Sequence, residues 1–174
     1  SSTINGISVG KGANSVAGNT ALGESALDAA TTGNQNTAVG FEALTSNTTG
    51  IRNTALGRKA LGSVTTGQQN TAVGQSALFN NAANNNTAVG HDALVSTTTG
   101  ANNVAVGANA ADANTTGGYN IAVGQNSLGA NETGNYNIAI GQDALANNTA
   151  SNNTAVGRSA LVANTTGGNN TAIG

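Results

Sequence analysis

The sequence predicts an all-β protein, a parallel β-solenoid (β-roll) built from coils of 16 or 17 residues. Three observations carry this prediction: one phrase returns along the whole chain, its apolar residues alternate with a period of two, and a glycine follows them at a fixed position. Alternation with a period of two is typical of strands, whereas a helix spaces its apolar residues three and four apart. A short, fixed repeat predicts stacked units that share one core.

The full repeat reads N-T-A-V-G-x-x-A-L-x-x-N-T-T-G-x-x, and its residues are numbered here as positions 1 to 17. Nine complete repeats occupy residues 19–169, and residues 170–174 begin a tenth. Residues 1–18 form a lead-in, for which we predict one shorter, degenerate coil. Position 1 is always asparagine, and stacked asparagines can form a ladder in which each amide hydrogen-bonds to the next. The predicted ladder consists of Asn19, Asn36, Asn53, Asn70, Asn86, Asn103, Asn120, Asn137 and Asn153.

The first predicted strand covers positions 2 to 4 of each repeat. Position 4 is always Leu, Val or Ile, and position 2 is Thr except at Val104, Ile121 and Ile138. We expect positions 2 and 4 to face inward and the Ala of position 3 to face outward. The apolar pair at positions 8 and 9 predicts a second short strand. The predicted core consists of Val39, Leu44, Val73, Leu78, Val89, Leu94, Val123, Leu128, Ile140, Leu145, Val156 and Leu161.

Two corners are predicted to connect these strands. The glycine at position 5 indicates a left-handed backbone or a corner too tight for a Cβ atom. The Thr-Thr-Gly run at positions 13–15 is the second corner, and it is missing from both 16-residue repeats, which read NNAANN (80–85) and NNTASN (147–152). Loops tolerate deletions and stacked strands do not, so this pattern favours a solenoid. The predicted corner glycines are Gly23, Gly40, Gly57, Gly74, Gly90, Gly107, Gly124, Gly141 and Gly157.

The composition excludes several classes of function. Of the 174 residues 7% are charged, the net charge is −2, and there is no cysteine. We therefore expect no electrostatic attraction to nucleic acid, no disulfide and no thiol chemistry. No apolar run approaches the roughly 20 residues of a membrane-spanning helix, and no signal-peptide pattern opens the chain. The start at Ser1 and the end within a repeat predict a processed chain or a part of a longer one.

We expect neither an enzyme nor a cofactor. His91 is the one histidine and precedes Asp92, but these residues occupy positions 6 and 7, where another repeat has Arg58 and Lys59. A pair that changes charge from coil to coil is typical of a solvated corner. Carboxylates do not cluster, and the Gly-rich, Asp-bearing nonapeptide of calcium β-rolls is absent, so we expect no metal.

Two surface features remain as candidates for binding. Positions 6 and 7 hold most of the charged residues and form a variable stripe that a receptor could contact. Tyr119 and Tyr136 occupy position 17 of adjacent repeats and are expected to stack on each other, with stacking on a sugar as the alternative.

The core of one coil is thin, because it contains no large aromatic residue. We therefore predict support from partner chains in a homotrimer. The small, outward Ala of position 3 would allow neighbouring chains to approach closely. An exposed terminal coil is an unpaired strand edge, which leaves end-to-end assembly open.

The phrase NTAVG and its variants NVAVG (103–107), NIAVG (120–124) and NIAIG (137–141) resemble the S-V-A-I-G-type head repeat of YadA-like trimeric adhesins. The opening GISVGKGANSVAG (6–18) is the best match, with Ile7 and Val9 in the inward places. In that family such repeats wind into a left-handed parallel β-roll, and three chains pack side by side. The longer form NTAVGxxAL…NTTG is similar to the repeat arrays of bacteriophage tail fibres and related virion or cell-surface fibres, and this likeness covers essentially the whole chain.

These resemblances imply an extracellular chain, on a virion tail fibre or a bacterial cell surface. The predicted function is structural, as a rigid trimeric shaft that supports attachment to a host or surface. One alternative is an adhesive module that binds a receptor or glycan along its flank, and another is a self-assembling extracellular filament. Ice binding is less favoured, because the Thr of position 2 is expected to face inward. The expected partners are other copies of the chain and a host receptor or glycan, with no nucleic acid and no membrane insertion.

Overall fold

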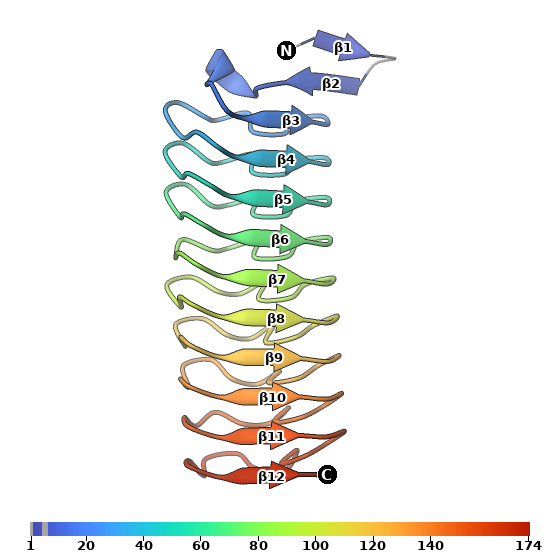
Figure 1. Cartoon of the computed structure of the whole chain (residues 1–174), viewed down its shortest axis with the longest axis vertical. Coiled ribbons are helices and arrows are strands. Elements are labelled where there is room, and N and C mark those ends of the chain that lie inside the picture. The colour runs from blue at the N-terminus through green and yellow to red at the C-terminus, as the bar shows by residue number, and fades with distance from the viewer. Residues whose placement is uncertain (1, 5–6) are drawn as a thin grey trace.

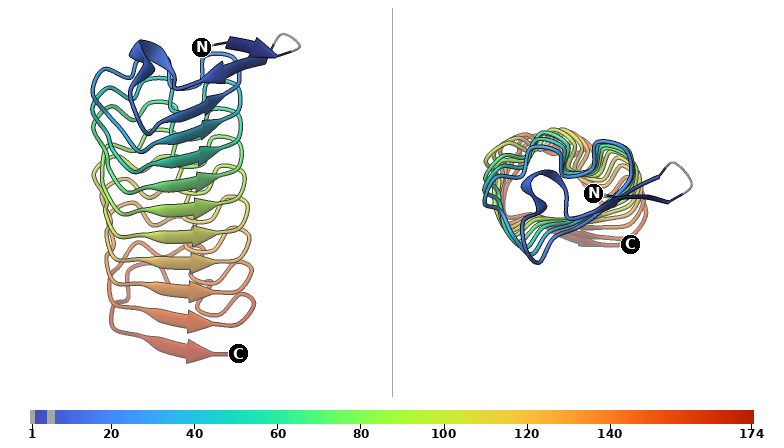
Figure 2. Two further views of the ribbon diagram at one scale, coloured as in Figure 1. Left: turned by 45° about the horizontal axis from the view of Figure 1, so that its top comes forward. Right: turned by 90° about the horizontal axis from the view of Figure 1, so that it is seen from above.

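The computed structural model describes residues 2–4 and 7–174, and it is a parallel β-solenoid, as the repeat predicted (Figure 1). Ten three-residue strands, one from positions 2 to 4 of each repeat, stack into a single sheet along one side of the rod. Viewed along the rod, coils of similar outline lie over one another with a progressive offset from the N-terminal to the C-terminal end (Figure 2). The strands are β3 (Thr20–Leu22), β4 (Thr37–Val39), β5 (Thr54–Leu56), β6 (Thr71–Val73), β7 (Thr87–Val89), β8 (Val104–Val106), β9 (Ile121–Val123), β10 (Ile138–Ile140), β11 (Thr154–Val156) and β12 (Thr171–Ile173).

Every strand from β3 to β12 pairs in parallel with the next, position by position. Thr54 pairs with Thr71, and this register persists across the two 16-residue coils, where Thr71 pairs with Thr87. In the first of these coils Ala83 takes the place of the position-15 glycine, since its carbonyl accepts the same asparagine hydrogen bond. The missing residue is thus absorbed at the corner, as predicted.

The two faces of the sheet are the reverse of those predicted. The position-3 alanines are buried in β3–β11, whereas the side chains of positions 2 and 4 point outward. The prediction that the aliphatic residues of position 4 form the core was therefore wrong for Val39, Val73, Val89, Val123, Ile140 and Val156. Val89 and Ile140 are 36% and 39% exposed, and the other four are partly exposed. The position-1 asparagine explains the reversal: it points inward to make hydrogen bonds, and alternation then places position 3 inside as well.

Positions 6 to 11 form turns, so the predicted second strand was wrong. The position-9 leucines nevertheless fill the core together with the alanines of positions 3 and 8. Leu44 and Leu78 are fully buried although their φ angles are left-handed, at 51° and 52°. Leu94, Leu128 and Leu145 are also fully buried, while Leu161 is only partly buried and packs against the core. The left-handed residues bend the chain sharply, which closes each coil around its position-9 side chain, a leucine in every coil except the one with Ala111.

The lead-in is not a shorter coil. β1 (Ser2–Ile4) and β2 (Ile7–Gly10) form an antiparallel hairpin, and β2 also pairs antiparallel with β3. A short 3₁₀ segment, η1 (Ala13–Ser15), then leads into the first coil. The hairpin pairs with the edge of β3, so β1 is the outermost strand of the sheet at this end and β12 is the outermost strand at the other. Gly6 and the side chain of Ile7, which belong to the stretch that resembles adhesin heads, lie outside what the structure describes.

The position-5 glycines are required by both backbone conformation and stacking. Their φ angles lie between 121° and 142°. At Gly74 φ is 132°, and a Cβ atom would lie 2.4 Å from the carbonyl oxygen of Gly90 in the next coil. Neither backbone can move without opening the ladder between β6 and β7.

We expect Gly74→Ala to lower the free energy of unfolding by about 3 kcal/mol or more, because it adds backbone strain to a clash between coils. Gly129→Ala is the matched control: its Cβ would meet chiefly the flexible side chain of Asn126, and the next coil already has Ala146 at this position. The control is expected to change stability by less than about 0.5 kcal/mol. Urea denaturation followed by circular dichroism measures both, and equal losses in the two variants would contradict this role of the corner.

Candidate functional site

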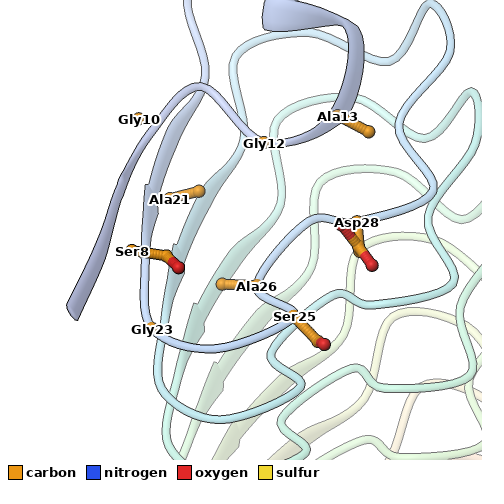
Figure 3. Close-up of a pocket in the computed structure, with 9 residues that line it drawn as sticks. All are labelled: Ser8, Gly10, Gly12, Ala13, Ala21, Gly23, Ser25, Ala26 and Asp28. Atoms are coloured by element: carbon orange, nitrogen blue, oxygen red, sulfur yellow. The ribbon is translucent and has the colours of Figure 1, made fainter. Parts of the chain in front are cut away.

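A small pocket of about 130 Å³ lies at the N-terminal end, where the lead-in covers the first coil (Figure 3). Asp28 supplies its one carboxylate, and Ser8 and Ser25 supply hydroxyl groups. The lining contains no imidazole or amine that could activate these hydroxyls as nucleophiles. The remaining lining residues are Gly10, Gly12, Ala13, Ala21, Gly23 and Ala26.

His91 and Asp92 contact each other, with 3.2 Å between Nδ1 and Oδ2, but both are substantially exposed to solvent. No third group orients the imidazole toward a substrate in the part of the chain that the structure describes. Within the same residues, no three His, Asp or Glu side chains lie close enough together to bind a metal ion. No helix among them has the length and apolar character needed to cross a membrane.

Some other side chains of positions 6 and 7 pair between neighbouring coils. Lys59 Nζ lies 3.4 Å from Glu42 Oε2, and the guanidinium of Arg58 lies 6.0 Å from the ring centroid of Phe41. Exposed ion pairs of this kind contribute at most about 1 kcal/mol each. These two contacts link the coil that begins with β4 to the coil that begins with β5. The side chains of positions 6 and 7 share no chemical character from coil to coil.

Tyr119 and Tyr136 stack on each other, as predicted, with ring centroids 5.1 Å apart and an interplanar angle of 13°. Both residues remain more than half exposed, at 55% and 59%. Each ring uses one face for its partner, so the pair adds exposed aromatic surface to two successive coils.

The position-1 asparagines form a buried ladder, although most of its bonds differ from the predicted ones. In Asn86 the Oδ1 atom accepts the backbone N–H of Asn103 in the next coil at 2.9 Å, and Nδ2 donates to the carbonyl of Gly100 at 2.8 Å. The same two bonds recur from coil to coil. Direct amide-to-amide bonds occur between Asn70 and Asn53 at 3.2 Å, and again from Asn170. Most hydrogen bonds of the ladder therefore join an asparagine side chain to the backbone. The backbone N–H of position 1 precedes the strand and would otherwise have no partner.

A second buried asparagine column lies at position 12, and sequence reasoning missed it. Asn47 Nδ2 donates to the carbonyl of Gly50 at 3.1 Å, and Asn114 and Asn131 make the equivalent bond. The signal was the asparagine that six of the nine complete repeats have at position 12, a position to which the sequence analysis gave no role. The buried members of this column are Asn47, Asn81, Asn114, Asn131 and Asn148.

A continuous uncharged surface, here called the outer face, runs along the whole sheet. It consists of the position-2 and position-4 side chains of β3 to β12, the surface that the sequence analysis placed in the core. Val106 is 38% exposed and Leu56 47% exposed. Parallel sheets normally have both faces covered, and exposed apolar patches of more than a few hundred Å² mark interaction sites. The outer face is therefore the candidate functional site.

We expect Asn86→Ala to lower the free energy of unfolding by about 2–5 kcal/mol, because it leaves a buried N–H and a buried carbonyl unpaired. Asn80→Ala is the control, since Asn80 is exposed and its backbone bond to Val95 does not involve the side chain. Urea denaturation compares the two variants. A loss at Asn86 no larger than that at Asn80 would mean that the ladder does not stabilise the coil.

No family model, no curated protein and no solved structure matches the chain. The likeness of its repeats to those of YadA-like adhesin heads and tail fibres therefore remains a prediction from the sequence.

Proposed function

We propose that the chain is a non-enzymatic shaft segment of an extracellular fibre, a phage tail fibre or a cell-surface adhesin, in which copies of the rod pack side by side. Three copies are the number that the resemblance implies. The observation that supports this most directly is the outer face, an uncovered sheet face ten strands long with no charged side chain. The position-3 alanines cannot make the contact suggested by the sequence analysis, because they are buried within each chain.

The outer face is large enough for a stable interface. With about a third of each side chain exposed, its two columns present roughly 1,000 Å² of accessible surface, compared with about 800 Å² per partner in a standard protein interface. Most of this surface consists of the methyl groups of Thr, Val, Leu and Ile. Covering it would supply the apolar burial that the thin core of one coil lacks.

A second copy of the chain is the occupant that fits this surface best. The outer face repeats at the strand spacing of about 4.8 Å over ten coils, and another copy has the same spacing along its whole length. Copies related by an axis parallel to the rod therefore meet coil by coil. A partner with a different spacing would match the outer face only locally.

The remaining features suit a shaft. The sheet, the asparagine ladder and the backbone bonds at the corners run without interruption through the repeats, so every coil is held by both neighbours. The repeats vary mainly at positions 6, 7, 10, 11, 16 and 17, and most of the side chains at these positions are at least partly exposed. Such a rod provides length and stiffness, which are the properties that hold an attachment site away from a particle or cell.

We expect the purified chain to form oligomers. The substitution Val106→Asp is expected to raise their dissociation constant at least about 100-fold, since burying an unpaired carboxylate costs several kcal/mol. Val106 is 38% exposed in the single rod, so the variant can keep its fold. Asn109→Asp adds the same charge to the same coil away from the outer face and serves as the control. Sedimentation equilibrium measures the mass. A wild-type chain that is a folded monomer would contradict the proposal.

Ice binding is the second candidate, and one observation favours it. The position-2 threonines point outward, opposite to the orientation that had made this function less favoured. Five of them follow one another at the strand spacing, in an arrangement that can order water: Thr20, Thr37, Thr54, Thr71 and Thr87.

If copies of the chain cover the outer face, we expect no thermal hysteresis in a solution of the wild-type protein. Nanolitre osmometry makes the measurement. Hysteresis that is lost in Thr54→Tyr and retained in Asn80→Tyr, a change away from the sheet, would instead assign the outer face to ice.

A further inference from the structure

The two tyrosines form an exposed aromatic surface that the fold does not require. The chain has two Tyr, two Phe and no Trp, and Tyr119 and Tyr136 occupy position 17 of successive coils. Both rings lie outside the buried core, and the other complete coils have Gln, Asn or Arg at this position. The stack of coils therefore forms without a tyrosine here. Exposed aromatic side chains with a polar tip are typical of binding surfaces.

One face of each ring remains available to a ligand. The position-17 column reads Asn102, Tyr119, Tyr136 and Asn152 along the rod, so each tyrosine has its stacking partner on one side and an asparagine on the other. Neighbouring coils are about 4.8 Å apart. An asparagine side chain is much shorter than a tyrosine side chain, so the phenol end of each ring projects past it. The exposed fractions of 55% and 59% agree with this arrangement.

Polar groups beside the rings are held in place and have hydrogen-bonding capacity left. Asn135 Oδ1 accepts the backbone N–H of Gly118 at 2.8 Å, and Ser151 Oγ accepts the backbone N–H of Asn135 at 2.9 Å. The Ser151 hydroxyl keeps its own proton, and the side chains of Asn102 and Asn152 form no hydrogen bond with another residue that the structure describes. Together these groups can donate to a ligand and accept from it.

We infer that five of these residues bind a neutral glycan, and we call them the tyrosine site: Asn102, Tyr119, Tyr136, Ser151 and Asn152. A pyranose ring has a face of C–H groups and a rim of hydroxyl groups. The C–H face packs on the free face of a tyrosine ring, and the hydroxyl groups bond to the two amides and the serine. Positions 16 and 17 hold no charged residue from residue 101 to 169, so an acidic sugar has no cationic partner here.

The tyrosine site is distinct from the outer face and adds a binding function to the proposed shaft. Its residues belong to positions 16 and 17, whereas the outer face consists of positions 2 and 4. One buried asparagine, Asn120 or Asn137, separates each tyrosine from the next strand, so the tyrosines lie at the border of the outer face. The experiment must therefore distinguish a glycan from a second copy of the chain as the group that covers the rings.

The tyrosines supply their own reporter for this distinction. Because the chain has no tryptophan, fluorescence excited beyond the phenylalanine band comes only from Tyr119 and Tyr136. Acrylamide quenching of the wild-type protein, in whatever oligomer it forms, measures how open the rings are. We expect a quenching constant about half that of N-acetyltyrosinamide, in line with the exposed fractions of 55% and 59%. Rings that another copy shields from acrylamide would overturn the inference.

The binding test uses a printed array of neutral oligosaccharides of hexoses and N-acetylhexosamines, with sialylated glycans beside them. The test variant carries Tyr119→Asn and Tyr136→Asn. It is expected to fold, because Asn102 and Asn152 occupy the same position in the flanking coils, and circular dichroism checks this. The matched control is Phe41→Gln, which removes another exposed aromatic side chain at a position where a later coil has glutamine.

We expect the wild-type protein to bind neutral glycans of the array and the control to bind them equally well. Binding should fall at least about 10-fold in the double tyrosine variant, and the free glycan should change the tyrosine emission of the wild-type protein. Binding of no neutral glycan, or equal binding by the double variant, would overturn the inference. A protein that is monomeric by sedimentation but binds these glycans would contradict the proposed self-association alone, so the two failures can be told apart.

Discussion

The hydrogen bond from the position-1 asparagine to the next coil is the constraint on which the rest of this structure depends. The Oδ1 atom of Asn36 accepts the backbone N–H of Asn53, and its Nδ2 atom holds the corner carbonyl of Gly50. The Asn36 side chain thereby links its coil to the next one and also joins the start of its own coil to the corner near its end. Because both partners lie inside the coil, the asparagine must point inward. A buried amide with both groups paired stabilises the coil, whereas an unpaired one would destabilise it strongly.

This orientation determines which side chains the sheet buries and which it displays. Positions 1 and 3 share a face, so alanine lies inside and the larger β-branched residues lie outside. The sheet thus buries its smallest apolar residue and exposes its larger ones, the reverse of the usual preference. The leucines of position 9 fill most of the remaining interior, and Ala111 takes this position in the coil of residues 103–119. The uncovered outer face is a direct consequence, so the proposed self-association would depend on the same hydrogen bond as the fold.

The tight corners show how a coil of 17 residues closes around so small an interior. Non-glycine residues adopt left-handed φ angles at positions 7, 9 and 17, for example Ser76 at 55° and Gln69 at 59°. Such angles cost about 1–2 kcal/mol each in isolation. Backbone bonds to the adjacent coils offset this cost, since Ser76 and Gln69 both donate to the preceding coil. The bends are therefore stable only within the stack, which couples each coil to its neighbours.

The sequence by itself determined the solenoid, its coil boundaries, the corner glycines and the stacked tyrosines, because these depend on spacing, and spacing is visible in one repeat. It also placed asparagine in a ladder at position 1. Only the tertiary structure decided which face of each strand points inward, the turn conformation of positions 6 to 11 and the antiparallel hairpin over β3. Hydrophobicity alone favours Leu56 inward and Ala55 outward, whereas in the structure Ala55 is buried and Leu56 is 47% exposed. The choice was made by a polar contact between residues 14 and 17 positions apart, which no local pattern contains.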